Sequence, residues 1–584
     1  MLDKDLQSIQ EARTLVTQTA EVQKEFAKFS QEKIDAVVAA MAEAGRREAE
    51  RLARMAVEET GYGNVEDKIC KNRFATDIVY EYIKNIKTVG ILREDAQNHV
   101  WEVAAPMGVV AAIIPTTNPT STTIYKSLIA LKAGNGIVLS PHPNAVKCIN
   151  ESARILHESA VAAGAPPNII TCLSRATLEA TQELMKHRLT AIILATGGPG
   201  LVRAAYSSGR PALGVGPGNV PAFIDRSAAV PKAVSDVLAG KTFDYGTLCS
   251  SENALVVDEP IHEQVTAELK QQGAHICSPS ETEALGRLLV TPQGTLNTAV
   301  VGKSALHIAA LAGIKVPKTT RALVGPTEGV GKAFPLSLEK LSPILAYYVV
   351  RDWQEGSRRC TEILNYGGLG HSMVLHCQNR DVIKAFALQQ PAFRILVNTL
   401  ASIGAVGYTT GLVPAMTLGC GSFGANITSD NIGPQHLLNL KRVAFETRPY
   451  QQKAAPSATT VPSAAGGGIS RETIREIVDE LIARRTIKMK EPHSLPARPT
   501  PPASPPPAPP QSAGSPVELK TPPEPPSAVT QAAKHLQAVV DFVSEYDVKT
   551  ALAQHRKIHL SVKAIITPSA RELGEAHQVF IREA

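Results

Sequence analysis

The chain has 584 residues and a formal net charge of +6, and it contains 41 prolines, 41 glycines and only 2 Trp, 12 Tyr and 12 Phe. This length indicates two or more domains, because a domain usually takes about 100–200 residues. The basic residues do not cluster as they do in nucleic-acid-binding proteins, and the longest uncharged apolar run, residues 103–115, is too short to cross a bilayer. The composition therefore argues against nucleic-acid binding and against a membrane protein.

The eight cysteines show no C-x-x-C pair and no spacing typical of a metal site. We therefore expect free thiols in a reducing cytoplasm and no bound metal. The chain begins without the basic and apolar regions of a secretion signal, which agrees with this expectation.

The first 450 residues have the pattern of a folded α/β protein. Residues 3–60 carry apolar positions at helical spacing without proline, which predicts two or three helices. From residue 103 onward, short β-branched runs alternate with helical stretches, as in doubly wound parallel sheets. The predicted elements are strands 109–114, 136–139, 168–171 and 191–194 with helices 121–133 and 145–163, then strands 254–257, 344–350, 373–375 and 395–397.

The chain after residue 450 has a different composition. No aromatic residue occurs between Tyr450 and Phe542, and 15 of the 37 residues from 491 to 527 are proline. Such a segment cannot bury enough apolar surface to offset the conformational entropy of the chain. Within this tail, Ile474, Ile477 and Leu481 follow helical spacing and predict one narrow apolar stripe on a charged helix. An isolated helix of this kind is marginal in water, so we expect it to bind a partner, to cap a domain or to self-associate.

Four predicted strands end in polar or glycine-rich strings, at residues 115–119, 140–143, 196–200 and 214–219. Glycine lets a planar or phosphorylated ligand approach the backbone closely, and tight strand-to-helix turns are the alternative reading.

Cys249 stands out among the cysteines because it lies in a small, polar, turn-like stretch before the predicted strand 254–257. A cysteine at the end of an element can be exposed and have a lowered pKa. A buried structural thiol is the alternative.

These strings, in this order, resemble the aldehyde dehydrogenase superfamily. The residues that carry the resemblance are the string 106–140, Thr196-Gly197-Gly198-Pro199-Gly200, the string 214–219 and Gly-Thr-Leu-Cys-Ser-Ser-Glu around Cys249. They are most similar to the CoA-acylating acetaldehyde and propionaldehyde dehydrogenases of bacterial microcompartments, over residues 15 to 447.

The resemblance implies an α/β fold with two doubly wound domains, an oligomerisation element and a largely disordered C-terminal tail that carries amphipathic helices. The implied parts are an NAD/CoA-binding domain at 1–225 completed by 431–450, a catalytic domain at 226–430, a linker at 451–468, a targeting helix at 469–488, a Pro-rich linker at 489–527 and a helical or motif-bearing tail at 528–584, including a helix at 528–545.

The resemblance also implies a reaction. Cys249 attacks the aldehyde carbonyl as a thiolate to form a thiohemiacetal, while the Asn118 side-chain amide holds the developing oxyanion. Hydride transfer to NAD leaves a thioacyl-enzyme, which coenzyme A converts to acyl-CoA. His371 matches a histidine of the acylating branch; it either deprotonates a thiol, with a pKa near neutral, or caps a turn.

In the acylating branch, NAD and coenzyme A use overlapping adenine sites in turn. Glu339, four residues before Pro343, matches the carboxylate that contacts the nicotinamide ribose, and the choice between NAD and NADP stays open. The predicted cofactor-binding residues are Thr116, Ser140, Pro141, His142, Thr196, Gly197, Gly198, Val215, Gly216 and Glu339. Residues 419–424 also fit G-x-G-x-x-G, but they do not open a βαβ unit, so we do not assign them to a dinucleotide.

One departure from the hydrolytic members favours thiolysis. Those members carry a glutamate in a Glu-Leu-Gly-Gly string, where it activates water, and Gly214 stands at that position here. Loss of a general base slows attack by water about 10²–10⁴-fold, whereas a thiol needs no comparable help.

The predicted function is oxidation of a short aliphatic aldehyde, with propionaldehyde as first choice, by NAD and coenzyme A. The resemblance implies a homodimer or homotetramer in the bacterial cytoplasm, inside the lumen of a microcompartment. The tail helix is similar to peptides that bind shell proteins, and Ile-Thr-Pro-Ser-Ala-Arg at 566–571 resembles a motif of other microcompartment proteins. The alternatives are acetaldehyde as the main substrate, a hydrolytic enzyme that gives the free acid, and a scaffold without catalysis.

Overall fold

The structure is a computed structural model that describes residues 4–450, 470–488, 540–543, 545–554, 556–566 and 568–582. The chain divides into two compact units, Met1–Ala454 and Ala455–Ala584. The predicted linkers at 451–468 and 489–527 lie outside the described residues. Across the described ranges, no helix combines the length and the apolar character that crossing a membrane requires.

The first unit begins with helices, as predicted. Three long helices are followed by a shorter one that continues through a π-helical turn, Phe74–Val79, into a last turn. Their bounds are α1 Lys4–Phe26, α2 Gln31–Arg47, α3 Ala49–Thr60, α4 Val65–Arg73 and α5 Tyr80–Ile83. Asn64 caps α4, because its side-chain oxygen accepts the Asp67 N–H.

A five-stranded parallel sheet follows, in the order β5-β4-β3-β6-β7. Its elements are β3 Val109–Ile114, α6 Pro119–Lys132, β4 Gly136–Pro141, α7 Val146–Ala162, β5 Ile170–Cys172, α8 Leu178–Lys186, β6 Thr190–Thr196, α9 Pro199–Tyr206 and β7 Ala212–Val215. The odd-numbered residues of β3 pack in one cluster with α1 and α8, and the even-numbered residues pack in another with α2, α6 and α7. The sheet is therefore covered on both faces, which confirms the doubly wound prediction.

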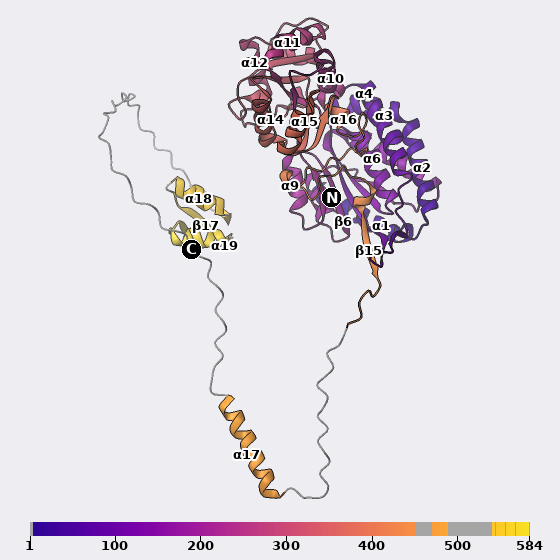
Figure 1. Cartoon of the computed structure of the whole chain (residues 1–584), viewed down its shortest axis with the longest axis vertical. Helices are drawn as coiled ribbons and strands as arrows, with labels where there is room; N and C mark the ends of the chain where they lie inside the picture. The colour runs from indigo at the N-terminus through magenta and orange to yellow at the C-terminus, as the bar shows by residue number, and fades with distance from the viewer. Residues whose placement is uncertain are drawn as a thin grey trace, which may run out of the picture. The chain divides into compact units, whose positions relative to one another are not determined.

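The second sheet has seven parallel strands, in the order β10-β11-β12-β9-β8-β13-β14. Its strands are β8 Val220–Ile224, β9 Glu252–Asp258, β10 Ala274–Ile276, β11 Ala322–Pro326, β12 Ile344–Val350, β13 Gly370–His376 and β14 Ala392–Val397. Its helices are α10 Val230–Thr242, α11 His262–Gln271, α12 Pro279–Leu289, α13 Ala305–Ala312, α14 Trp353–Gly367, α15 Arg380–Gln389 and α16 Ala401–Gly404. Figure 1 shows α11, α12, α14 and α15 in one half of the first unit and α1, α2 and α3 in the other.

The boundary between the two sheets differs from the predicted one at residue 225. Strand β8 pairs with β9 and β13 and therefore belongs to the second sheet. The first sheet ends at Val215, so the chain crosses between the sheets in the glycine-rich string 216–219. A short buried strand carries no sign of its sheet in its own sequence, because only its neighbours decide where it pairs.

Residues 438–444 join a third, antiparallel sheet. Strand β15 (Leu438–Ala444) pairs along its whole length with β2 (Val100–Pro106), which also pairs with β1 (Ile91–Asp95). This segment, predicted to complete the first domain, thus returns to the strand that precedes β3.

The predicted tail helix is present as α17, Arg471–Lys488. The Thr473 N–H donates to the Ser470 hydroxyl at 3.2 Å, which caps its N-terminus. Ile474, Ile477, Val478 and Leu481 are all exposed, with 45% to 62% of their surface accessible.

The predicted helix at 528–545 is wrong at its C-terminal end, and its residues 528–539 lie outside the described range. Residues 540–582 form a parallel three-stranded sheet, ordered β16-β17-β18, with two helices. Its elements are β16 Val540–Val543, α18 Glu545–Ala553, β17 Ile558–Ile566, α19 Pro568–Ala576 and β18 Phe580–Arg582. Val543, Val548, Leu560 and Ala570 are buried in its core. Pairing with β17 decides the conformation of 540–543, because strand preference depends on neighbouring strands more than on local sequence.

Candidate active site

The predicted cofactor residues other than Glu339 lie at the carboxyl edge of the first sheet. From β3, the chain leads to β4 and β5 on one side and then crosses to β6 and β7 on the other. The topological switch point therefore lies between the loops that follow β3 and β6, where ligands bind in open α/β sheets. Thr116 follows β3, Pro141 ends β4, Thr196 ends β6 and Val215 ends β7.

Several groups at this edge are free to receive a ligand. The Thr196 hydroxyl is buried, and no described residue forms a hydrogen bond with it. Gly198 is the N-cap of α9, and a Cβ built there or on Gly216 would meet no atom within 4 Å. The N-terminus of a helix with open backbone in front of it suits a phosphate group.

Two predicted residues have partners within the protein. The Ser140 hydroxyl is buried and lies 2.8 Å from the Thr181 hydroxyl of α8. The Nδ1 atom of His142 accepts the Asn144 N–H at 3.1 Å, and burial lowers the pKa of His142. Both residues therefore help to shape the end of β4 with their side chains.

Cys249, Glu339 and His371 meet around Gly218. A Cβ built on Gly218 would lie 1.8 Å from the Cys249 carbonyl oxygen and 3.2 Å from Cε1 of His371. The Gly218 N–H donates to the Glu339 carboxylate at 2.7 Å. Only glycine fits at this position, and three predicted site residues from distant parts of the chain are thereby brought into one cluster.

The electrostatic setting of Cys249 differs from the predicted one. The residue is partly exposed. Burial of the thiol, together with the Glu339 charge, raises its pKa to about 12, although Arg394 acts in the opposite direction. The expectation of a lowered pKa is therefore wrong for this state, because the local sequence does not reveal desolvation by distant groups. At neutral pH the thiol is protonated and needs a proton acceptor before it can attack.

His371 is a possible acceptor. It is fully buried at the start of β13, its Nδ1 lies 3.1 Å from the Ser372 hydroxyl, and its Nε2 has no hydrogen-bond partner among the described residues. Burial and the nearby charge of Arg394 lower its pKa to about 3, so the expected near-neutral pKa is wrong. The imidazole is neutral at physiological pH and can accept a hydrogen bond, but with this pKa it is a weak base.

Arg394 and Cys420 are members of this site that sequence reasoning missed. Arg394 is buried in β14 and donates from Nε to the His371 carbonyl at 3.1 Å and from Nη2 to the Gly419 carbonyl at 2.5 Å. The Cys420 thiol is buried, and burial raises its pKa to about 11. The only local sign of Arg394's role in the sequence was that it is the single charged residue in the otherwise apolar strand β14. The 419–424 string thus packs against β13, the strand that carries His371.

Asn118 is linked to the Cys249 segment through a lysine. It is the N-cap of α6, and its Oδ1 accepts a hydrogen bond from Nζ of Lys71 at 2.6 Å. Its Nδ2 donates to the Thr117 hydroxyl at 3.1 Å. Lys71 also lies 3.5 Å from the Thr247 hydroxyl, two residues before Cys249.

Position 214 has no room for a catalytic carboxylate. A Cβ built on Gly214 would lie 2.8 Å from a Val202 methyl and 3.1 Å from the Tyr206 ring, both on α9. The Gly214 N–H donates to the Tyr206 hydroxyl at 3.1 Å. The helix therefore closes the space where a general base for water would stand.

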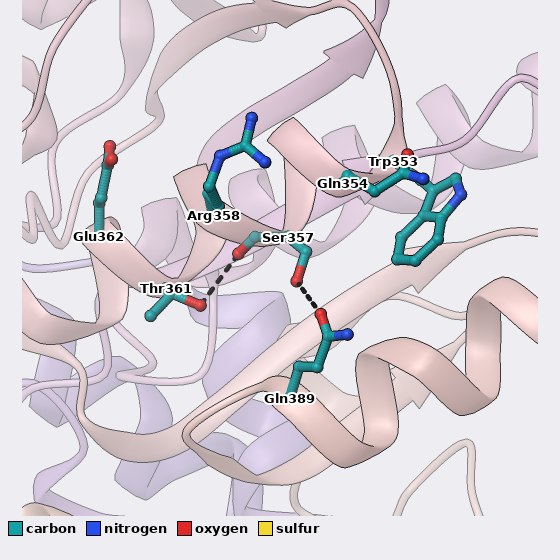
Figure 2. Close-up of a pocket in the computed structure, with 7 residues that line it drawn as sticks. All are labelled: Trp353, Gln354, Ser357, Arg358, Thr361, Glu362 and Gln389. Carbon is teal, nitrogen blue, oxygen red and sulfur yellow. Dashed lines mark hydrogen bonds between the residues drawn. The ribbon is translucent and has the colours of Figure 1, made fainter.

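Two cavities differ in their relation to this site. A small one of about 10 Å³ is lined mainly by apolar side chains, among them Phe74, Phe243, Leu248, Ile403, Val406 and Met416. Leu248 directly precedes Cys249. A larger groove of about 510 Å³ runs along the outer face of α14, where Ser357 bonds Thr361 and Gln389 (Figure 2). None of the predicted site residues lines this groove.

Comparisons with known proteins show the family of this chain. The aldehyde dehydrogenase family matches residues 5–284. An aldehyde-alcohol dehydrogenase of Clostridium acetobutylicum is 45% identical over 429 residues, which are 73% of this chain and 49% of that protein. The chain thus spans about half the length of such curated relatives.

Two solved structures match the chain over nearly their whole length. An acetylating aldehyde dehydrogenase from Geobacillus thermoglucosidasius has a TM-score of 0.76 and 53% identity, covering 78% of this chain and all of that one. A propionaldehyde dehydrogenase from the Clostridium phytofermentans fucose utilisation bacterial microcompartment has a TM-score of 0.67 and 30% identity, covering 76% and 98%. The chain belongs to the acylating branch of the aldehyde dehydrogenase family.

Proposed function

We propose that this protein oxidises a short aliphatic aldehyde with NAD and coenzyme A and releases acyl-CoA. The observation that carries the proposal is the meeting of Cys249, Glu339 and His371 around Gly218, beside a position 214 that holds no base for water. Family membership supports the same reaction type.

In this proposal, the Cys249 sulfur forms the bond to the aldehyde carbon. Its proton must leave first, because a neutral thiol is a weak nucleophile. The neutral imidazole of His371, whose Nε2 has no partner among the described side chains, accepts a hydrogen bond from the thiol. The proton passes on to water as the sulfur–carbon bond forms, because a pKa of about 3 makes His371 too weak a base to keep it. The free N–H of the Asn118 amide donates to the oxygen that becomes negative as the sulfur–carbon bond forms.

The carboxyl edge of the first sheet fits a dinucleotide. The buried Thr196 hydroxyl offers an unused polar atom, and the open backbone at Gly198 and Gly216 admits close approach. When bound, NAD supplies the acceptor for the aldehyde hydride. The Glu339 carboxylate, whose pKa is raised by burial, accepts the Gly218 N–H and is placed to orient the cofactor ribose.

Coenzyme A, rather than water, takes the acyl group in this proposal. A thiol attacks a thioester readily, whereas water needs a general base. Val202 and Tyr206 occupy the space beside Gly214 that such a base would need.

The names of the relatives support a short substrate chain. Propionaldehyde remains our first choice, in line with one structural relative, and acetaldehyde is the second, in line with the aldehyde-alcohol dehydrogenases.

The exposed stripe of α17 supports delivery to a partner. Ile474, Ile477, Val478 and Leu481 present apolar surface on one narrow face, as helices that dock into grooves do. We propose that the partner is a shell protein of a bacterial microcompartment, in whose lumen the enzyme works as a homodimer or homotetramer. One relative comes from such a compartment.

A steady-state assay tests the reaction. Acetaldehyde, propionaldehyde and butyraldehyde are each supplied with NAD, with and without coenzyme A. We expect NADH formation to require coenzyme A and to be most efficient with a two- or three-carbon aldehyde. Formation of the free acid at full rate without coenzyme A would contradict the proposal.

A further inference from the structure

A buried cluster of one carboxylate and two lysines lies between Asn118 and the segment that carries Cys249. We call it the Asp244 cluster; it consists of Asp244, Lys68 and Lys71. Asp244 belongs to the short turn Phe243–Gly246 that leads into Cys249, and both lysines come from α4. The three side chains are at most 4% exposed.

The two lysines share the carboxylate but differ in their second contact. Nζ of Lys68 lies 3.0 Å from Oδ2 of Asp244 and donates to the Thr117 carbonyl at 3.2 Å. Nζ of Lys71 bonds the same Oδ2 and donates to Oδ1 of Asn118 at 2.6 Å. Lys68 therefore reaches only the backbone next to Asn118, whereas Lys71 reaches its side chain.

The carboxylate itself is held firmly. Its Oδ1 accepts the Asn64 N–H at 2.9 Å, and the Asp244 N–H donates to Asp67 at 2.7 Å. Asp244 has a φ of +47°, a left-handed conformation that non-glycine residues seldom adopt. A Cβ built on Gly63 would overlap its carboxylate. The surrounding structure thus fixes the turn and, through it, the position of Lys71.

An asparagine amide can present either its oxygen or its nitrogen to a given side. An ammonium group has only hydrogen-bond donors, so it can bond the oxygen of the amide but not its nitrogen. We infer that Lys71 is a positioning residue that turns the Asn118 amide so that Nδ2 faces the oxygen of the reacting aldehyde. One N–H of Nδ2 bonds the Thr117 hydroxyl, which leaves the second for this oxygen. This inference rests on the proposed role of Asn118 as the oxyanion donor.

The charges of the cluster explain why Lys71 bonds Asn118. Two lysines face one buried carboxylate, and Asp67 accepts the Asp244 N–H beside it. Charges buried in this way are costly unless they are paired and hydrogen-bonded, and the Asn118 oxygen supplies one of the bonds that Lys71 needs. Burial still lowers the pKa of Lys71 to about 8, so the group is charged at neutral pH.

The test compares Lys71→Met with Lys68→Met in the full-length enzyme. Both variants remove one cation from Asp244, but only the first removes the partner of the Asn118 oxygen. We expect Lys71→Met to lower kcat about 10–100-fold, which is less than the loss of about 10²–10³-fold that follows removal of an oxyanion donor. The KM values for aldehyde, NAD and coenzyme A should each change less than about threefold. Lys68→Met should lower kcat less than about threefold. Equal losses of kcat in the two variants would overturn the inference.

A double variant separates positioning from general damage. If Lys71 acts through Asn118, Lys71→Met/Asn118→Ala should be no more than about threefold slower than Asn118→Ala alone. Losses that multiply would overturn the inference. If Asn118→Ala keeps its turnover, the oxyanion role itself is wrong; if it loses turnover and Lys71→Met does not, only the positioning role is wrong.

A third variant leaves Lys71 in place in case its replacement prevents folding. Asn118→Asp keeps an oxygen for the ammonium group but has no N–H for the substrate. We expect it to be as slow as Asn118→Ala and to have a higher Tm, because the new carboxylate pairs with Lys71. A Tm no higher than that of Asn118→Ala would contradict the contact between Lys71 and the side chain at position 118.

Discussion

The unit of residues 4–450 and the helix α17 use their apolar side chains in opposite ways. In the first unit, every residue of β3 and β9 is buried, and the strands are covered by helices on both faces. In α17, four apolar side chains at helical spacing keep about half or more of their surface exposed. The first arrangement supplies its own stability, whereas the second gains stability only when a partner covers it. The difference teaches that the candidate active site and the exposed apolar stripe lie in separate parts of the chain, as the proposed division between catalysis and delivery requires.

The proposed division between the first unit and α17 is tested most severely at Cys249. We expect Cys249→Ala to lower the CoA-dependent turnover at least about 10⁴-fold, because no covalent intermediate can form. The variant should still be recovered with shell proteins to the same extent as the unmodified enzyme. Cys360→Ala, which removes a buried thiol on the core side of α14, is the matched control and should keep turnover within about tenfold. Normal turnover in Cys249→Ala would leave a scaffold as the better reading.

A second change tests how closely the site is packed. Gly218→Ala places a Cβ on the Cys249 carbonyl oxygen, so the backbone must shift and carry Cys249 and Glu339 with it. We expect kcat to fall about 10²-fold, because small displacements at a reacting centre cost that much. Gly200→Ala, where a Cβ meets no atom within 4 Å, should change kcat less than about twofold. Equal kcat values for the two variants would mean that Gly218 is not part of the site.

The pH dependence of alkylation tests the state of Cys249. Its pKa, raised by burial to about 12, means that the reactive thiolate fraction grows throughout the usable range. In enzyme free of NAD, we expect the rate of inactivation by iodoacetamide to rise about tenfold per unit between about pH 7 and pH 10. A plateau that begins below about pH 9 would show that Arg394 outweighs burial and keeps the thiolate.

The smallest effect on catalysis is expected from the tail. Removal of residues 451–584 should change kcat less than about twofold, because every residue assigned to the site lies before residue 451. The same truncation should abolish co-purification with microcompartment shells. Leu481→Asp, at a side chain that is 62% exposed, should weaken this association while leaving the Tm within about 1 °C. Unchanged association in both variants would refute the assignment of α17.

The sequence was most informative where a signal is local. Strands β3 and β12 agree residue for residue with the predicted runs 109–114 and 344–350, because strands buried on both faces read as continuous apolar stretches. The amphipathic spacing of α17 was visible for a similar reason. The sequence did not reveal the strand β16 or the sheet to which β8 belongs, because both depend on partner strands elsewhere in the chain.

The same division holds within the site. Cys249, Asn118, Glu339 and His371 were found through motifs in which the neighbouring residues are part of the signal. Lys71 and Arg394 were missed, because their partners are distant along the chain; Lys71 and Asp244 are 173 residues apart. No local pattern distinguishes such residues from an ordinary charged side chain.

The sequence by itself determined the candidate nucleophile Cys249, the glycine at position 214, the alternation of strands and helices and the change of composition after residue 450. Only the tertiary structure decided that Gly218 joins Cys249, Glu339 and His371, that α9 closes the space beside Gly214, and that burial raises the pKa of Cys249 and lowers that of His371. The reason is physical. Residue types fix which chemistry is possible, whereas desolvation, close contact and the field of nearby charges arise from groups that come together only in the folded chain.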